Sequence, residues 1–206
     1  MAYPLAMAKG LKSFLFATAL VLMTLLAVAQ ERPLTMVELY TSQGCSSCPP
    51  ADAFLGELAD REGVLALSFH VDCWDHIAWK DPYANRAHSD RQRRYTWHFG
   101  RRYIYTPQMV IHGIAEELGS DRSKVLRRID ETAKLKRIPV RLGHGADRST
   151  ITISVPQEAT NDDVEVFMVW LVVYNRSHET VIKRGENRGR TIRNFNMVRG
   201  LRRVAT

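Results

Sequence analysis

The stretch Glu38–Asp52, "ELYTSQGCSSCPPAD", contains two cysteines, Cys45 and Cys48, separated by two residues. It follows an apolar run and precedes a segment in which apolar residues recur at helical spacing. A Cys-x-x-Cys pair between a strand and a helix is compatible with a redox dithiol, half of a metal site or a structural disulfide. Most of the chemistry open to this chain depends on which of the three it is.

The first thirty residues have the layout of a secretory signal peptide. Lys9 and Lys12 precede an uncharged apolar run that ends in Ala-Val-Ala at 27–29. We expect residues 1–29 to be a cleaved signal peptide. The alternative is an uncleaved anchor, because the length of the run is borderline for a membrane span. The mature chain is then expected to be periplasmic or secreted, without a membrane span, in a compartment where disulfides persist.

Residues 30–137 are predicted to form an α/β domain. Strands and helices are expected in the order β-α-β-α-β-β-α, over 34–42, 48–60, 63–72, 83–99, 107–113, 114–118 and 121–136. Pro49 and Pro50 suit the first turn of the first helix, where a missing N–H costs nothing. Asp121 is expected to cap the last helix. The continuous apolar run "GVLALSFHVD" is typical of a buried parallel strand.

Two further regions complete the chain. Residues 73–105 form an aromatic, basic and His-rich insert within the α/β domain. Residues 138–206 contain several strand-like segments with turn signals between them and are predicted to form an antiparallel β unit. This unit is expected either to extend the first sheet or to pack on it.

The position of the cysteine pair favours thiol–disulfide exchange. A free thiol has a pKa of about 8.5, and the unpaired N–H groups and dipole at a helix N-terminus lower it. Cys45, which precedes the predicted helix, is expected to be the exposed attacking thiol, and Cys48 the resolving one. The expected partners are protein thiols or disulfides and a redox partner that recycles the dithiol.

The segments "GCSSCPP" and "YTPQMVI", in the element order above, resemble thioredoxin-like proteins. The resemblance implies a thioredoxin-like fold with an appended C-terminal antiparallel β unit. It also implies a cis bond between Thr106 and Pro107, facing the cysteines. By the same resemblance Glu38 is the acid that relays a proton to the resolving cysteine. An outward-facing strand residue and an ordinary trans proline are the alternatives.

The mature chain also resembles a narrower family of secreted bacterial proteins of unknown function, to which a thioredoxin-like fold is assigned. The resemblance rests on "VELYTSQGCSSCPPAD", "FHVDCWD", "WKDP", "YTPQMVIHG" and "RGENRGRTI". It implies fold and location and brings no substrate. It suggests a role for the segment 184–190, "RGENRGR", without a mechanism.

Cys73 leaves other functions open. It is expected to be a buried unpaired thiol, a second resolving thiol, or a metal ligand together with Cys45, Cys48 and a histidine such as His76 or His70. Thiolates and imidazole suit zinc or copper(I), so a metal-binding module is one alternative to a redox enzyme without a cofactor. A binding or structural protein with an inert disulfide is another.

The charge balance does not point to nucleic acid. The formal net charge is +7, and the 29 Lys and Arg residues are spread along the chain. The densest basic stretch, 86–102, is interleaved with aromatic residues, but export argues against a nucleic-acid partner. An acidic partner, lipid headgroups or an ordinary solvated face are the remaining interpretations of this stretch.

Overall fold

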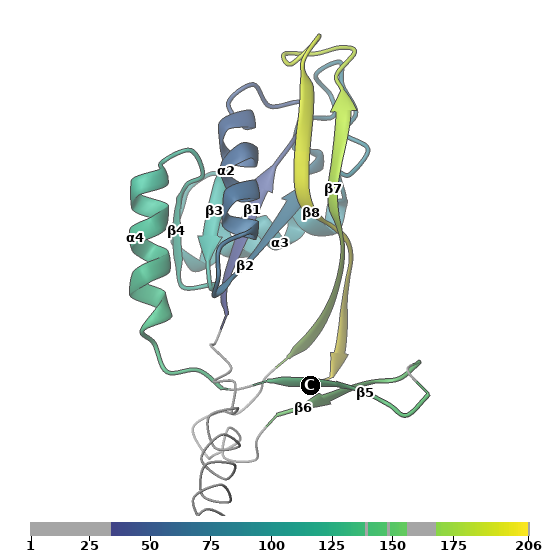
Figure 1. The fold of residues 1–206 in the computed structure, drawn as a ribbon. Coiled ribbons are helices and arrows are strands. Elements are labelled where there is room, and N and C mark those ends of the chain that lie inside the picture. The colour runs from purple at the N-terminus through teal and green to yellow at the C-terminus, as the bar shows by residue number, and fades with distance from the viewer. Residues whose placement is uncertain (1–33, 139, 148, 156–167, 206) are drawn as a thin grey trace, which may run out of the picture. The chain divides into compact units, whose positions relative to one another are not determined.

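The computed structural model describes residues 34–138, 140–147, 149–155 and 168–205 (Figure 1). Residues 1–29, for which a signal peptide is predicted, lie outside the described part of the chain. None of the described helices is long and apolar enough to cross a membrane.

A mixed six-stranded sheet in the order β4-β3-β1-β2-β8-β7 forms the centre of the fold. Its first four strands and the α-helices around them are β1 (Thr35–Thr41), α2 (Pro49–Ala59), β2 (Val64–His70), α3 (Arg86–His98), β3 (Gln108–Ile111), β4 (Ala115–Leu118) and α4 (Arg122–Ala133). A short 3₁₀ helix, Asp72–Trp74, follows β2. The predicted α/β class and the β-α-β-α-β-β-α order are confirmed.

Strand β1 contributes side chains to two cores, one on each face of the sheet. Val37 and Leu39 pack with apolar residues of α2 and α4. Tyr40 packs on the other face, against which α3 lies (Figure 1). This alternation follows from the period of two along a strand, and it also directs Glu38 away from the face that α2 covers.

The C-terminal strands β7 (Val169–Val181) and β8 (Thr191–Ala205) extend the same sheet. They pair with each other in antiparallel fashion, whereas β8 joins β2 in parallel, with Ser68 opposite Met197. The described pairings within the predicted C-terminal unit are antiparallel, as expected, and the unit extends the first sheet through β8. Strands β5 (Arg141–His144) and β6 (Ile151–Ser154) form a separate two-stranded antiparallel sheet.

The helix ends largely follow the local signals. Pro49 and Pro50 occupy the first two positions of α2, and the Asp121 side chain accepts from the Lys124 N–H at the start of α4, as expected. The predicted start of α3 at Tyr83 is wrong. The helix starts at Arg86 because the Asn85 side chain accepts from the Ala87 N–H and caps it.

Helix α2 packs closely against β8 through a glycine. A Cβ atom built on Gly56 would lie 2.5 Å from the Phe195 ring, so the two elements approach this closely only because position 56 lacks a side chain. The contact fixes the helix that begins directly after Cys48.

Candidate dithiol site

Cys45 and Cys48 lie between the end of β1 and the start of α2. Cys48 is the N-cap residue of α2, and both cysteines are free thiols. The expectation that Cys45 is exposed is wrong, since only 1% of its surface is accessible. Hydrogen bonds from Ser47, Thr106 and Asn187 reach it from three segments of the chain and enclose it.

The surroundings of Cys45 favour its thiolate. The pKa of Cys45 is lowered to about 6, chiefly by a hydrogen bond from the Cys48 thiol, against the opposing effect of burial. The hydroxyls of Ser47 and Thr106 lie 3.3 Å from its sulfur and lower the pKa further. The Trp74 indole donates to Thr106 Oγ1 at 2.8 Å, which orients that hydroxyl toward the sulfur.

The groups that stabilise the Cys45 thiolate differ in part from the helix N–H groups that the sequence indicated. Pro49 and Pro50 have no N–H groups, so the first turn of α2 offers fewer donors than an ordinary helix start. The Ser46 N–H is bound by the Glu186 carboxylate at 3.0 Å. The thiol of Cys48 and the two hydroxyls are therefore the main donors to Cys45.

Cys48 keeps its proton more strongly. Burial raises the pKa of Cys48, and its hydrogen bond to Cys45 and the Asp52 carboxylate raise it further. Two sulfurs with pKa values displaced in opposite directions are suited to different roles, one as nucleophile and one as a thiol that must be deprotonated before it reacts.

Asp52 is the acid that lies beside Cys48. It is one helical turn along α2, is buried, and neither of its oxygens makes a hydrogen bond of regular geometry with the described residues. Burial raises the pKa of Asp52 to about 7. The Thr41 hydroxyl lowers the pKa of both Cys48 and Asp52, although it too makes no hydrogen bond of regular geometry. A carboxyl group that titrates near neutrality can accept a thiol proton.

Glu38 has a different environment from the predicted one. Its carboxylate forms a bidentate ion pair with Arg91, at 2.6 and 2.7 Å, and accepts from the hydroxyls of Tyr40 and Tyr95. Among the described residues no hydrogen bond or ion pair joins Glu38 to Cys45 or Cys48. These contacts assign Glu38 to the core beneath α3.

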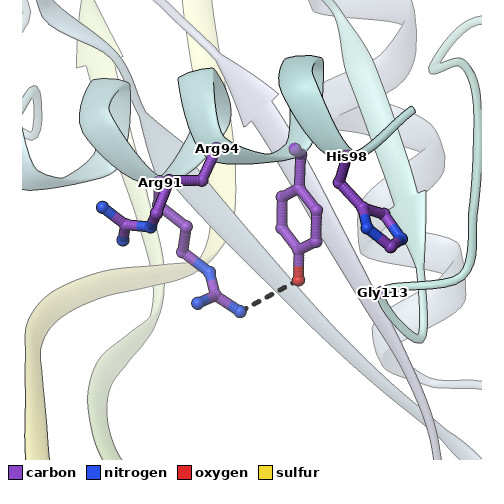
Figure 2. A pocket seen from close by; sticks show the side chains of 5 residues that line it. Arg91, Arg94, His98 and Gly113 are labelled. Atoms are coloured by element: carbon purple, nitrogen blue, oxygen red, sulfur yellow. Dashed lines mark hydrogen bonds between the residues drawn. The ribbon is translucent and has the colours of Figure 1, made fainter. Parts of the chain in front are cut away.

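A hollow of about 290 Å³ lies next to this ion pair, away from the cysteines. The Arg91 guanidinium donates to the Tyr95 hydroxyl at 3.1 Å, drawn as the dashed line in Figure 2. His98 and Gly113 also line the hollow. The basic stretch around it is mostly paired: Arg86 and Arg93 contact Asp90, and Arg101 contacts Glu116.

The Thr106–Pro107 bond is cis and lies beside the dithiol. The Thr106 carbonyl oxygen accepts from the Ser47 hydroxyl at 3.4 Å and is 3.9 Å from the Cys45 sulfur. The structure thus brings Cys45, Cys48, Thr106 and Pro107 together.

The turn between β7 and β8 contributes residues that the sequence analysis did not identify. Asn187 is fully buried, and its Nδ2 donates to the backbone oxygens of Gln43 and Cys45, each at 2.9 Å. Glu186 binds the Ser46 N–H. The only sequence signal was the motif "RGENRGR", for which the resemblance suggested a role without a mechanism.

Cys73 is a half-buried free thiol just past β2. Burial raises the pKa of Cys73 to about 11, so it is a poor nucleophile at neutral pH. Among the residues that the structure describes, no group of three or more His, Cys, Asp or Glu side chains is placed to hold a metal ion. The proposed ligands Cys45, Cys48, Cys73 and His76 therefore do not form such a group here.

The fold and the site define an α/β protein with a buried dithiol at the start of a helix. The chain belongs to a family described as a protein of unknown function, DUF1223, whose model matches residues 36–206. A crystal structure of a protein from Agrobacterium tumefaciens is similar, with a TM-score of 0.70 and 28% identity over 86% of this chain and 75% of that one. A comparison with curated proteins found no match.

Proposed function

We propose that this chain is an exported thioredoxin-like thiol–disulfide oxidoreductase that acts through Cys45 and Cys48. The observation that carries the proposal is the opposite displacement of the two thiol pKa values, to about 6 for Cys45 and upward for Cys48. A structural disulfide does not require its two thiols to differ in pKa. The donors around Cys45 lower its pKa, and burial raises the pKa of Cys48.

The reaction has two steps. The Cys45 thiolate attacks a partner disulfide, which forms a mixed disulfide and releases one partner thiolate. Asp52 then accepts the Cys48 proton, and the Cys48 thiolate attacks the Cys45 sulfur, which forms the Cys45–Cys48 disulfide and releases the second partner thiolate. Two electrons pass from the dithiol to the partner, and a dithiol reductant restores the protein.

Proximity in the site supports this sequence. Cys48 already hydrogen-bonds to the Cys45 sulfur, so the second attack requires little movement. The Thr106 carbonyl oxygen and hydroxyl flank the same sulfur and offer a backbone position at which a partner chain can align.

Insulin reduction with dithiothreitol as reductant tests the proposal. Cys45→Ser is expected to abolish the activity, and Cys48→Ser is expected to accumulate a mixed disulfide. Cys73→Ser is the matched control and is expected to retain the wild-type rate, because the Cys73 thiol is protonated at neutral pH. A Cys45→Ser variant with the wild-type rate would contradict the proposal.

A further inference from the structure

A second buried polar pair lies beside Asp52. His70 Nδ1 is 2.7 Å from Asp81 Oδ2, and both side chains are fully buried. Asp81 also accepts from the backbone N–H groups of Gln43 and Tyr83, at 2.8 and 2.9 Å. These donors hold Asp81 as a carboxylate and fix its orientation toward the imidazole.

The backbone places this pair next to the dithiol. His70 ends β2 and is the register partner of Thr41 at the end of β1. The Thr41 hydroxyl acts on both Cys48 and Asp52. The unpartnered polar atoms Thr41 Oγ1, Asp52 Oδ1, Asp52 Oδ2 and His70 Nε2 therefore belong to neighbouring residues. Among the residues that the structure describes, four buried polar atoms of this kind are gathered at the dithiol, and such atoms are rare in folded proteins.

The pKa values of His70 and Asp52 depend on each other and on Asp81. Burial disfavours the His70 imidazolium, but the charge and hydrogen bond of Asp81, together with the Asp52 charge, raise the pKa of His70. Burial is the main influence on Asp52, and among the charges around it the imidazolium has the largest effect, lowering the pKa of Asp52. Without that cation the carboxyl would take up a proton at still higher pH.

We infer that His70 and Asp81 are positioning residues for the second step: Asp81 holds His70 as an imidazolium, and His70 keeps Asp52 ionised so that it can accept the Cys48 proton. The inference rests on the proposed function. The residues act in the order Asp81, His70, Asp52, Cys48, and only the cysteine touches the reacting sulfur.

Asp75 also faces the cluster, since its Oδ1 accepts from the Asp81 N–H at 3.1 Å. The groups that act on His70 besides Asp81 and Asp52 are His88, whose Nδ1 lies 2.9 Å from the His70 backbone oxygen, Arg199, and Tyr83, whose ring centroid is 5.3 Å away. Arg199 lowers the pKa of His70. The groups that act on Asp52 are Thr41, Cys45, Cys48, His70 and Asp81.

Reaction of the reduced protein with 5,5′-dithiobis(2-nitrobenzoate) separates the two steps. In a Cys73→Ser background, the attack of Cys45 releases one thionitrobenzoate, and the attack of Cys48 on the mixed disulfide releases a second. The rate of the second release is expected to rise with pH, with a midpoint near the Asp52 pKa of about 7.

His70→Gln removes the cation while keeping similar size. We expect the midpoint of the second release to rise by about one pH unit, which is a loss of up to about tenfold in rate below pH 7. The first release is expected to stay within about twofold, and high pH restores the second. Asp81→Asn has two opposing effects on the pKa of Asp52, because it removes both the Asp81 charge, which raises that pKa, and the partner that favours the His70 imidazolium, so His70→Gln is the deciding variant. His98→Gln, at an exposed histidine in the last turn of α3, is the control and keeps the wild-type midpoint.

The outcomes separate the two claims. A folded His70→Gln protein with the wild-type midpoint would overturn the inference and leave the proposed function intact. A Cys45→Ser protein that still gives the first release would overturn the proposed function itself. If His70→Gln does not fold, the ¹⁵N shifts of His70 in the reduced wild-type protein decide: an imidazolium at pH 7 supports the inference, and a neutral ring contradicts it.

Discussion

Asn187, at the turn between β7 and β8, donates from Nδ2 to the backbone oxygen of Cys45 at 2.9 Å, although 142 residues separate the two. The same amide binds the Gln43 oxygen. The turn therefore holds the cysteine loop in place and contributes to the burial of Cys45.

Asn187→Ala is expected to loosen this loop. Two buried carbonyl groups lose their donor, which is expected to lower the free energy of unfolding by about 1–3 kcal/mol, measured by urea denaturation. The alkylation of Cys45 by a bulky maleimide is expected to become faster, because less of the loop is held over the sulfur.

Arg188→Ala is the control for this change, since Arg188 is exposed and adjacent in the same turn. It is expected to alter neither stability nor alkylation. An Asn187→Ala protein that is destabilised but alkylated at the wild-type rate would show that the turn does not shield Cys45.

Much of the fold could be predicted from local patterns in the sequence. The strand β1, the prolines at the start of α2 and the Asp121 cap each depend on neighbouring residues. The parallel pairing of β8 with β2 could not be predicted, because it joins Ser68 to Met197 through contacts with no local signature.

The site could be predicted only in part, for the same reason. Cys45, Cys48 and the Thr106–Pro107 segment come together as expected, whereas the turn at 184–190 reaches them from the far end of the chain. The acid beside Cys48 did have a signal. Asp52 is four residues after Cys48 on a helix, a spacing that places two side chains on one face.

The pH dependence of Cys45 tests the origin of its reactivity. The rate of alkylation by iodoacetamide, in a Cys73→Ser background, is expected to rise with a midpoint near pH 6, because the thiolate is the reactive form. Cys48→Ala removes the main donor and is expected to move the midpoint upward. A midpoint near the ordinary thiol value of about 8.5 in the wild-type protein would contradict the account.

Asp52→Asn is expected to stabilise the fold while slowing the second step. Because burial raises the pKa of Asp52 to about 7, ionisation of this group opposes folding as the pH rises from about 4 to 7, and the cost is fully present above 7. The variant is expected to be more stable than the wild-type protein at pH 8, by on the order of a few kcal/mol.

The difference between Asp52→Asn and the wild type is expected to shrink at pH 5, where most of the wild-type carboxyl is already protonated. Urea denaturation at both pH values measures it. Equal stabilities at pH 8 would mean that Asp52 is not a buried, readily protonated acid.

Glu38→Gln separates a packing role from a relay role for this residue. The change leaves the Arg91 guanidinium without its carboxylate partner in a largely buried site, which is expected to cost about 3–5 kcal/mol of stability. Both thionitrobenzoate releases are expected to keep their wild-type rates at temperatures where the variant is folded. A selective loss of the second release would restore Glu38 as the proton acceptor.

The most direct test of the central claim is the reduction potential of the Cys45–Cys48 pair in the protein without residues 1–29, measured in glutathione buffers with bound metal assayed on the same sample. The account predicts a value between about −120 and −270 mV without bound metal, within the range of thiol–disulfide exchange proteins. A pair that resists reduction, with a potential below about −300 mV, would make the disulfide structural and contradict the account.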